Sequence, residues 1–261
     1  MRSTLAYLAA LLGANLRAAF AQPVAALVAA LFMLGNNVIL YVVWVIYFAN
    51  FSSLRGWVAA DLALLLGVVA WAFGLAVVVA GGGREIAQAI DSGALDLHLG
   101  RPRHPLPSLL ASRSFPSGLG DMASAPVFWI VFADRGLGDV VFLLAVSSAA
   151  SAVIVATMVA TQSLAFWLPR AATLCEELFQ MFLMVCFYPQ HPFAFTVRLV
   201  LFTAVPAAFV ALLPVEAVRE GSALKALAVV GGAMVYAAVA AAIFARGLRR
   251  YASGNRMIEW R

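Results

Sequence analysis

The feature that most constrains this chain is a long stretch, residues 22–49, that contains no acidic or basic side chain. About 20 apolar residues in a helix are enough to cross the hydrocarbon core of a bilayer, which is about 30 Å thick. Hydrophobic residues make up 64% of the chain and charged residues only 11%. Because a water-soluble domain cannot bury that much apolar surface, the sequence predicts an all-α polytopic membrane protein.

Six stretches of this kind follow one another, at residues 22–49, 57–82, 115–133, 140–168, 172–188 and 226–245. A further apolar segment, residues 193–213, contains Arg198 and Pro206 and has prolines on both sides. This segment is either a seventh span or a re-entrant pair of short helices, and the distribution of charge distinguishes the two.

Arginine and lysine favour the cytoplasmic side of a membrane. With six spans, 12 of the 17 basic residues lie on the same side as both termini, whereas a seventh span would move the basic C-terminal tail to the other side. We therefore expect six transmembrane helices, both termini in the cytoplasm, and a re-entrant outer segment at residues 189–221. Residues 1–20 are interrupted by Asn15 and Arg17, which favours a retained amphipathic helix in the membrane interface over a cleaved signal peptide. The whole chain is then one membrane domain.

The longest polar stretch, residues 84–113, is predicted to be a cytoplasmic loop. Residues 84–90 are expected to form a short helix with Glu85 in its first turn, and Asp91, Ser92 and Gly93 form a stop or turn signal. Leu95, Leu97 and Leu99 alternate with Asp96 and His98 and are expected to be exposed, and Arg101-Pro102 and His104-Pro105 then favour an extended backbone. An ordered loop that exposes leucines indicates a docking surface for another protein.

Motifs for chemistry are missing from the sequence. A phosphate-binding loop of the form GxxxxGK[ST] does not occur, because the glycines at 81–83 are followed by Arg84 and Glu85. The three histidines have no metal-ligand spacing, and the basic residues form no face suited to nucleic acid. We therefore expect a protein that is not an enzyme and that binds no metal, cofactor or nucleic acid itself.

Polar residues inside predicted spans are the remaining functional candidates, because such residues are costly in a bilayer. Asn36 and Asn37 lie in the middle of the first span, and either one of them lines a substrate pathway or both hydrogen-bond to other helices. Glu176 and Glu177 lie near the beginning of the fifth span. Either they have a structural role, in which they interact favourably with the helix dipole and pair with Arg170, or they contact the substrate. Asp61 and Asp121 stand near the starts of spans and are expected to act as interfacial caps.

Two segments carry a resemblance to a known family. Residues 90–102 read I-x-S-G-x-L-D-x-x-L-x-R-P, and residues 188–221 contain Pro192-Phe193, Arg198, Pro206-Ala207-Ala208-Phe209 and Pro214. In these motifs and in the order of its spans the chain resembles the permease subunits of ATP-binding-cassette transporters of the type-2 superfamily, in the drug- and viologen-exporter-like branch. His98 departs from the family, which often has an apolar residue at that position.

The resemblance implies partners and roles. A separate ATPase subunit would bind ATP and Mg, a second permease, identical or paralogous, would complete the pathway, and a cytoplasmic coupling helix would dock on the ATPase. The residues that we assign to this docking are Glu85, Ile86, Ile90, Asp91, Leu95, Asp96, Leu97 and Leu99. The outer segment, with Arg198, Pro206 and Phe209, would form an outer gate.

The function that we expect is therefore ATP-driven export of a hydrophobic or amphipathic compound, such as a drug-like molecule or a lipid, across the cytoplasmic membrane of a prokaryote. Two alternatives remain at this stage. One is a polytopic membrane enzyme that acts on lipids, and the other is a channel or assembly scaffold without an ATPase.

Overall fold

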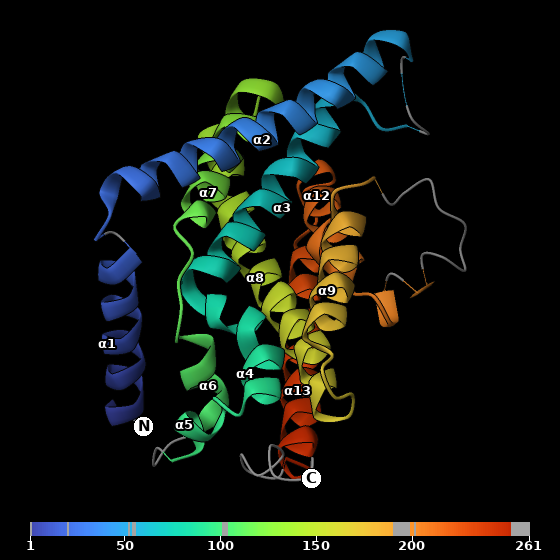
Figure 1. The fold of residues 1–261 in the computed structure, drawn as a ribbon. Helices are drawn as coiled ribbons and strands as arrows, with labels where there is room; N and C mark the ends of the chain where they lie inside the picture. Colours follow the sequence, from blue (N-terminus) through green and yellow to red (C-terminus); the bar gives the residue numbers. More distant parts are fainter. Residues whose placement is uncertain are drawn as a thin grey trace.

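The computed structural model describes residues 2–19, 21–51, 53, 56–100, 104–189, 199–200 and 202–251, and the protein is all-helical (Figure 1). The helices that follow one another along the chain are α1 (Arg2–Ala19), α2 (Pro23–Asn50), α3 (Ala59–Ala80), η1 (Gly81–Glu85), α4 (Ile86–Ser92), α5 (Asp96–Leu99), α6 (Pro105–Leu110), α7 (Ser117–Val127), η2 (Phe128–Phe132), α8 (Leu137–Gln162), η3 (Ser163–Phe166), α9 (Ala172–Cys186), α11 (Ala207–Val210), α12 (Leu212–Arg219) and α13 (Ala223–Leu248).

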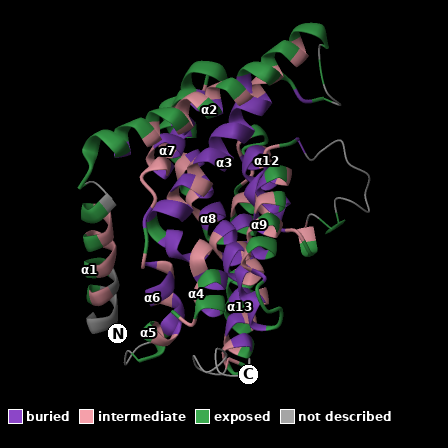
Figure 2. Cartoon of the chain, viewed as in Figure 1, coloured by how far each residue is buried: buried purple, intermediate pink, exposed green. Residues whose placement is uncertain are grey.

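The central helix of the bundle is α3, which packs against α7 and α8 and is buried along most of its length (Figure 2). It is apolar on every side, as expected for a helix surrounded by other helices. A Cβ atom on Gly74 would lie 2.4 Å from the carbonyl oxygen of Gly118, and one on Gly118 would lie 2.6 Å from that of Gly74. These two glycines therefore let the backbones of α3 and α7 touch, a common arrangement between membrane helices.

The helix of the second predicted span does not end at Gly82. Instead, α3, η1 and α4 form one continuous helical segment, Ala59–Ser92. The glycines at 81–83 are helical, and neighbouring residues pack tightly against them. A Cβ atom on Gly82 would lie 2.1 Å from the carbonyl oxygen of Leu109, and one on Gly83 would lie 2.6 Å from the Met158 side chain. The segment stops where expected, at Gly93, whose φ of 78° lies in the left-handed region that glycine tolerates.

Among the described residues, four helical segments are long and apolar enough to cross a membrane: Pro23–Asn50, Ala59–Ser92, Leu137–Phe166 and Ala223–Leu248. They correspond to the first, second, fourth and sixth predicted spans. The third and fifth correspond to shorter helices, Ser117–Phe132 and α9, which at about 1.5 Å per residue are shorter than the hydrocarbon core. Six crossings therefore remain a prediction. Pro126 lies inside α7, directly before the π-helical turn η2, which is a recognised way to absorb a helix irregularity.

The arrangement of α1 and α2 is visible in Figure 1. Helix α2 crosses the bundle obliquely and leaves most of its surface exposed, whereas α1 runs beside the bundle from the end that holds α5 and α6 (Figures 1 and 2). The amide of Asn15 in α1 donates a hydrogen bond to the carbonyl oxygen of Ala111, at 2.6 Å. The first 20 residues thus form the expected helix as far as they are described, and its place in the interface stays a prediction.

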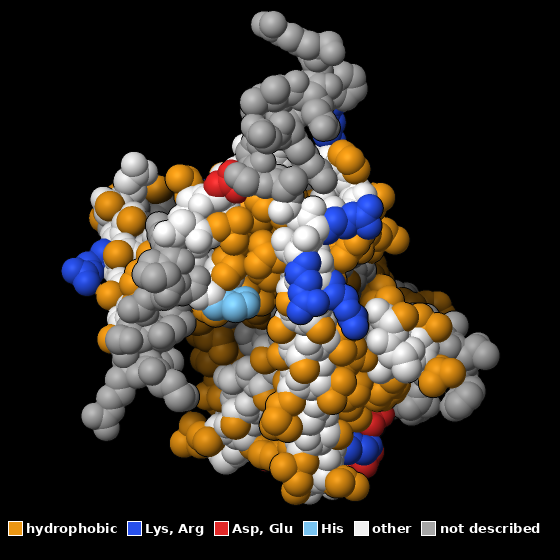
Figure 3. Space-filling view, turned by 90° about the horizontal axis from the view of Figure 1, so that it is seen from below, with side chains coloured by type: hydrophobic (Ala, Val, Ile, Leu, Met, Phe, Trp, Pro, Cys, Tyr) orange, Lys and Arg blue, Asp and Glu red, His pale blue; other side chains and the backbone are white. Residues whose placement is uncertain are grey.

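The two ends of the bundle differ in character. The end that holds α5, α6 and the last turn of α13 displays several basic side chains, among them the exposed Arg246, Arg249 and Arg250 (Figure 3). At the other end, α12 packs on α3 and α13 beside the first turns of both helices. The short helices α11 and α12 are largely buried against the longer ones, as expected of a re-entrant segment.

Candidate functional site

A cavity of about 300 Å³ lies between α2, α3, α7 and α9. Seven of the 13 residues that line it are apolar or aromatic and six are polar, including the ionisable Arg84 and Asp121. A mixture of apolar walls and convergent polar groups is compatible with a small-molecule site. The residues that line it are Met33, Asn36, Asn37, Phe73, Val77, Arg84, Phe115, Ser117, Asp121, Gln180, Leu183, Met184 and Phe187. Because α2, α7 and α9 meet here, the cavity brings together residues from three parts of the sequence that are far apart.

The two asparagines of α2 have different roles in this geometry. The buried Asn37 donates from Nδ2 to Oδ1 of Asp121, at 2.8 Å, and to Oγ of Ser124, at 3.1 Å. Asn37 therefore makes the interhelical hydrogen bonds that were one of the two expectations. Asn36 also lines the cavity but is exposed, so its amide group is available to a ligand.

Asp121 is not the interfacial cap that we expected. It lies in the second turn of α7, is 2% exposed and faces α2, because the close contact between α7 and α2 at Gly120 brings this part of α7 inward. Its Oδ2 atom is buried without a hydrogen-bond partner among the described residues. By contrast, Asp61 does cap its helix, since Oδ2 accepts a hydrogen bond from the backbone N–H of Val58, at 3.0 Å.

A polar cluster of four side chains lies next to the cavity. Glu176 forms an ion pair with Arg84 and accepts hydrogen bonds from Gln162, at 3.2 Å, and from Gln180, at 2.8 Å. The expected pairing of Glu176 with Arg170 is therefore wrong. Arg84 is the partner, because the continuous helix from α3 into α4 carries it against α9. Glu176 contributes to the wall between α3 and α9, whereas Glu177 in the same turn of α9 is exposed.

A second, larger cavity of about 570 Å³ adjoins the first on the side of α4 and the start of α9. Arg84 and Phe115 line both cavities, and Glu85, Glu176 and Glu177 line the second. The Phe115 ring centroid lies 5.7 Å from Cζ of Arg84 and 4.9 Å from Cζ of Arg113. Phe115 therefore lies close to two guanidinium groups, at the boundary between the 300 Å³ cavity and the 570 Å³ cavity.

The predicted docking loop is ordered, but its exposed residues are fewer than expected. Residues 96–99 form the helical turn α5, so Leu95, Leu97 and Leu99 do not share one face. The extended backbone expected at Arg101-Pro102 lies outside the described residues. Leu95 is fully buried, whereas Leu97 is 72% exposed and Leu99 is 37% exposed. Ile86 and Ile90 are also buried, in an apolar cluster with Phe166, Cys175 and Phe244. These three aliphatic residues hold the loop on the bundle and are not available for docking.

The acidic residues of the same loop have other partners. Glu85 forms an ion pair with Arg113. Asp91 accepts hydrogen bonds from the backbone N–H groups of Arg170 and Ala172, just before and at the start of α9. Asp96 is partly buried at the start of α5. Asp91 is exposed to solvent although it makes these hydrogen bonds, whereas Glu85 and Asp96 are partly buried.

At the opposite end of the bundle, Pro206 is buried and precedes α11, and Phe209 packs on the ring of Tyr236. Gly232 of α13 makes this possible, since a Cβ atom there would lie 2.3 Å from the Phe209 ring. The third predicted gate residue, Arg198, lies outside the described residues.

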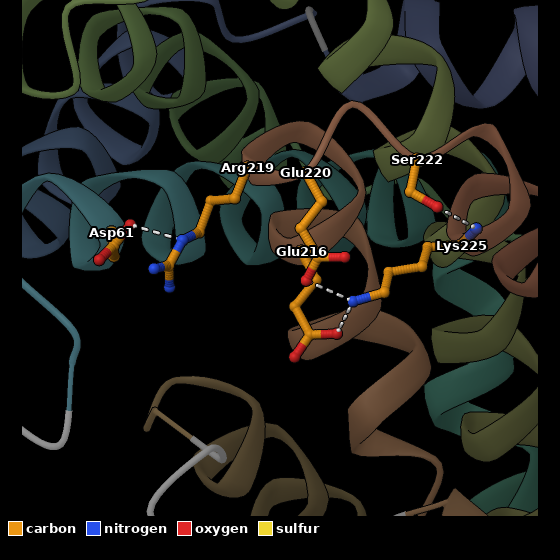
Figure 4. Close-up of polar contacts among 6 residues, drawn as sticks. All are labelled: Asp61, Glu216, Arg219, Glu220, Ser222 and Lys225. Carbon is orange, nitrogen blue, oxygen red and sulfur yellow. Dashed lines mark hydrogen bonds and ion pairs between the residues drawn. The ribbon is translucent and has the colours of Figure 1, made fainter.

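The same segment is tied to its neighbours by ion pairs, shown in Figure 4. Arg219 at the end of α12 contacts Asp61 of α3, at 3.3 Å, and Lys225 of α13 contacts Glu216 and Glu220, at 2.5 and 2.7 Å. We call these contacts the α12 ion pairs. These contacts join α12 to both α3 and α13. The sequence did not suggest the pairing of Asp61 with Arg219, since no local spacing relates the two residues.

Comparison with known proteins gives one match. The model of a family described as "ABC-2 family transporter protein" matches residues 34–254, which is most of the chain. No curated protein and no solved structure matches the chain.

Proposed function

The chain belongs to the ABC-2 family of transporter proteins, and from this premise we propose that it is the permease subunit of an exporter for hydrophobic or amphipathic compounds. The family makes the chain a multi-pass membrane component of a transporter, and the transport subunits of this family have no ATPase of their own. A separate ATPase partner follows from that membership. The assignment to the drug- and viologen-exporter-like branch rests on the two sequence motifs.

The observation that carries the proposed substrate class is the lining of the 300 Å³ cavity. Phe, Leu, Val and Met side chains make up seven of its 13 lining residues, and Asn36, Ser117 and Gln180 offer hydrogen bonds. Arg84 and Asp121 also line the cavity, but Arg84 is paired with Glu176 and Asp121 is hydrogen-bonded to Asn37. A compound with a large apolar surface and few polar groups suits such walls, whereas a hydrophilic ion with several charges would find no ring of charged side chains among these lining residues to replace its water. Glu177 and the 570 Å³ cavity would form the approach to this site from the cytoplasm.

The proposed orientation places α4, α5 and α6 in the cytoplasm and the α12 ion pairs outside. The bias of basic residues supports it. Reporter fusions after Arg261 and within residues 52–55 are expected to report opposite sides of the membrane, with the C-terminal fusion in the cytoplasm. A periplasmic signal from the C-terminal fusion would contradict the six-span topology.

Docking of the ATPase is proposed at the exposed leucines of α5, Leu97 and Leu99, because apolar anchors usually dominate such interfaces. Leu97→Asp is expected to prevent co-purification of the ATPase subunit while the permease still folds. Leu137→Asp is the matched control, since Leu137 is 79% exposed at the start of α8, where an acidic side chain suits the helix dipole. If Leu97→Asp retains the ATPase, the docking surface lies elsewhere.

The function itself is tested by reconstitution. The permease is co-expressed with each candidate ABC ATPase of the same genome, a complex that co-purifies is placed in liposomes, and ATP-dependent movement of ethidium and of a fluorescent phospholipid is measured. Movement of either probe that requires ATP and is changed by Asn36→Ala supports the proposal. Absence of any associated ATPase would contradict it, and would favour the lipid-active enzyme or the scaffold.

A further inference from the structure

Helix α9 is not capped by its own residues. Ala171, which precedes it, has no side-chain group to bond to the free N–H groups of the first turn. Asp91 of α4 supplies these bonds from a distant part of the sequence: Oδ1 lies 3.1 Å from the N atom of Arg170 and Oδ2 lies 3.2 Å from that of Ala172. Arg170 has a φ of 57°, a left-handed conformation that turns the chain so that both N–H groups point toward Asp91.

A carboxylate in this position makes strong contacts. Hydrogen bonds to an ionised acceptor are stronger than those between neutral groups, and a negative charge at a helix N-terminus also interacts favourably with the helix dipole. The two oxygens of Asp91 bind two different backbone groups, so the carboxylate fixes both the distance and the direction between the end of α4 and the start of α9.

One turn further along α9, a second set of contacts joins the same helices. The backbone N–H of Ala87 in α4 donates to Oε1 of Gln162, at 3.2 Å, and Nε2 of Gln162 donates to Oε2 of Glu176, at 3.2 Å. Arg84, just before α4, forms its ion pair with Glu176. Gln162 is 1% exposed, so this connection is shielded from water. The helices α4 and α9 are therefore attached at two points.

The other half of α9 forms one wall of the cavity. Gln180, Leu183, Met184 and Phe187 all line it. An α-helix of this length is stiff, so a displacement of its first turn also displaces the residues one to three turns later. Asp91 therefore binds the first turn of the same helix whose second half lines the proposed substrate cavity.

We propose that Asp91 is a positioning residue that fastens α9 to α4, so that when the ATPase displaces α4 the α9 wall of the cavity moves with it. This inference rests on the proposed function, because it requires an ATPase that acts on the α4–α5 region. It also assigns Asp91 a contact with α9 in place of the docking contact with the ATPase that the sequence suggested.

The test uses the complex of the full chain with its ATPase in lipid nanodiscs. A cysteine is placed at Met184, which lines the cavity and is 63% exposed, while Cys175 and Cys186 remain, since both are fully buried. The rate of reaction with a maleimide dye is measured without nucleotide and with ATP plus vanadate. In the otherwise native chain, ATP plus vanadate is expected to change the rate at least about threefold, or 0.65 kcal/mol in activation free energy.

Asp91→Ala is expected to reduce this change to about 1.5-fold while the ATPase still co-purifies, because the contacts of Arg84 and Gln162 with Glu176 remain as a second attachment. Asp91→Asn keeps one acceptor oxygen and is expected to retain more of the rate change than Asp91→Ala does. A protein that is merely destabilised would not show this ranking of the two variants. The control is Ser92→Ala, because the Ser92 hydroxyl bonds within α4, to the carbonyl oxygen of Gln88, and not to α9.

Three results would overturn the inference. The first is a full nucleotide-dependent change in Asp91→Ala, and the second is loss of the ATPase from that variant, which would make Asp91 a docking residue. The third is an unchanged labelling rate in the native chain while the ATPase remains bound. The third result leaves the proposed function intact, because co-purification of the ATPase tests that function separately.

Discussion

Replacing Asn37 with alanine removes both side-chain hydrogen bonds that join α2 to the polar residues of α7. Nδ2 of Asn37 lies 2.8 Å from Oδ1 of Asp121 and 3.1 Å from Oγ of Ser124, and all three side chains are buried. Because Oδ2 of Asp121 already has no partner among the described residues, the substitution leaves both oxygens of that carboxyl group without a hydrogen bond. The neighbouring Asn36 makes no comparable contact with another described helix and is exposed.

The expected magnitude follows from these contacts. An unpaired buried acceptor costs about 1–3 kcal/mol, and a side-chain hydrogen bond between membrane helices contributes about 0.6 kcal/mol on average. Asn37→Ala is therefore expected to lower the free energy of unfolding by about 2 kcal/mol, which for a chain of this size means a Tm lower by roughly 4–8 °C. Asn36→Ala is expected to change stability by less than about 0.5 kcal/mol and to alter the preference between substrates.

The assay is thermal unfolding of purified variants in one detergent, followed by tryptophan fluorescence. The variant Asn37→Ala/Asp121→Ala provides the decisive comparison, because removing both partners avoids an unpaired buried group. Its loss of stability is expected to be smaller than the sum of the two single losses. Additive losses, or an Asn36→Ala variant as unstable as Asn37→Ala, would refute the reasoning.

The remaining predictions concern packing and the end of the bundle that holds α12. Gly118→Val is expected to prevent folding, because its first side-chain carbon would lie 2.6 Å from the carbonyl oxygen of Gly74, whereas Gly136→Ala meets nothing within 4 Å and serves as the control in a comparison of folded yield. Arg219→Leu leaves the buried Asp61 without its ion-pair partner, and is expected to speed hydrogen exchange in α12, with partial recovery in Asp61→Asn/Arg219→Leu; an unchanged exchange rate would contradict this. Purified permease without its partner is expected to bind no ATP, as measured by equilibrium dialysis, since its sequence has no phosphate-binding loop.

Hydropathy and charge predicted the long helices well, because a run of apolar residues without charge has few alternatives in a chain of this composition. The signal was weaker where a helix is short or interrupted. Pro126 and the π-helical turn that follows it divide the third predicted span, and hydropathy averages over such irregularities. The helix of the second predicted span continues into the predicted cytoplasmic helix, as far as Ser92, which hydropathy could not show because the charged Arg84 and Glu85 follow Gly83. Leu109 and Met158 pack closely on the glycines at this junction.

The candidate site was predictable in its residue types and not in its pairings. Asn36, Asn37 and Glu176 stood out as polar residues in apolar runs, and all three line or adjoin the cavities. Their partners Asp121 and Arg84 are more than 80 residues away, so no local spacing could connect them. Leu95 was expected to be exposed together with Leu97 and Leu99, but one helical turn after Gly93 directs Leu95 inward and Leu97 outward.

Helix α9 connects the parts of the molecule that a transport cycle must coordinate. It is attached to α4 through Asp91 and Glu176, it lines the cavity with its second half, and it contacts α11 beyond the cavity. In the proposed orientation the 570 Å³ cavity adjoins the 300 Å³ cavity on the cytoplasmic side. On the outer side, the α12 ion pairs connect α12 to α3 and α13. A displacement of α9 that follows α4 would therefore reach the inner cavity and the outer segment in the same movement. This arrangement gives a physical reason for access to change at both ends of the cavity together, since a single stiff helix touches both.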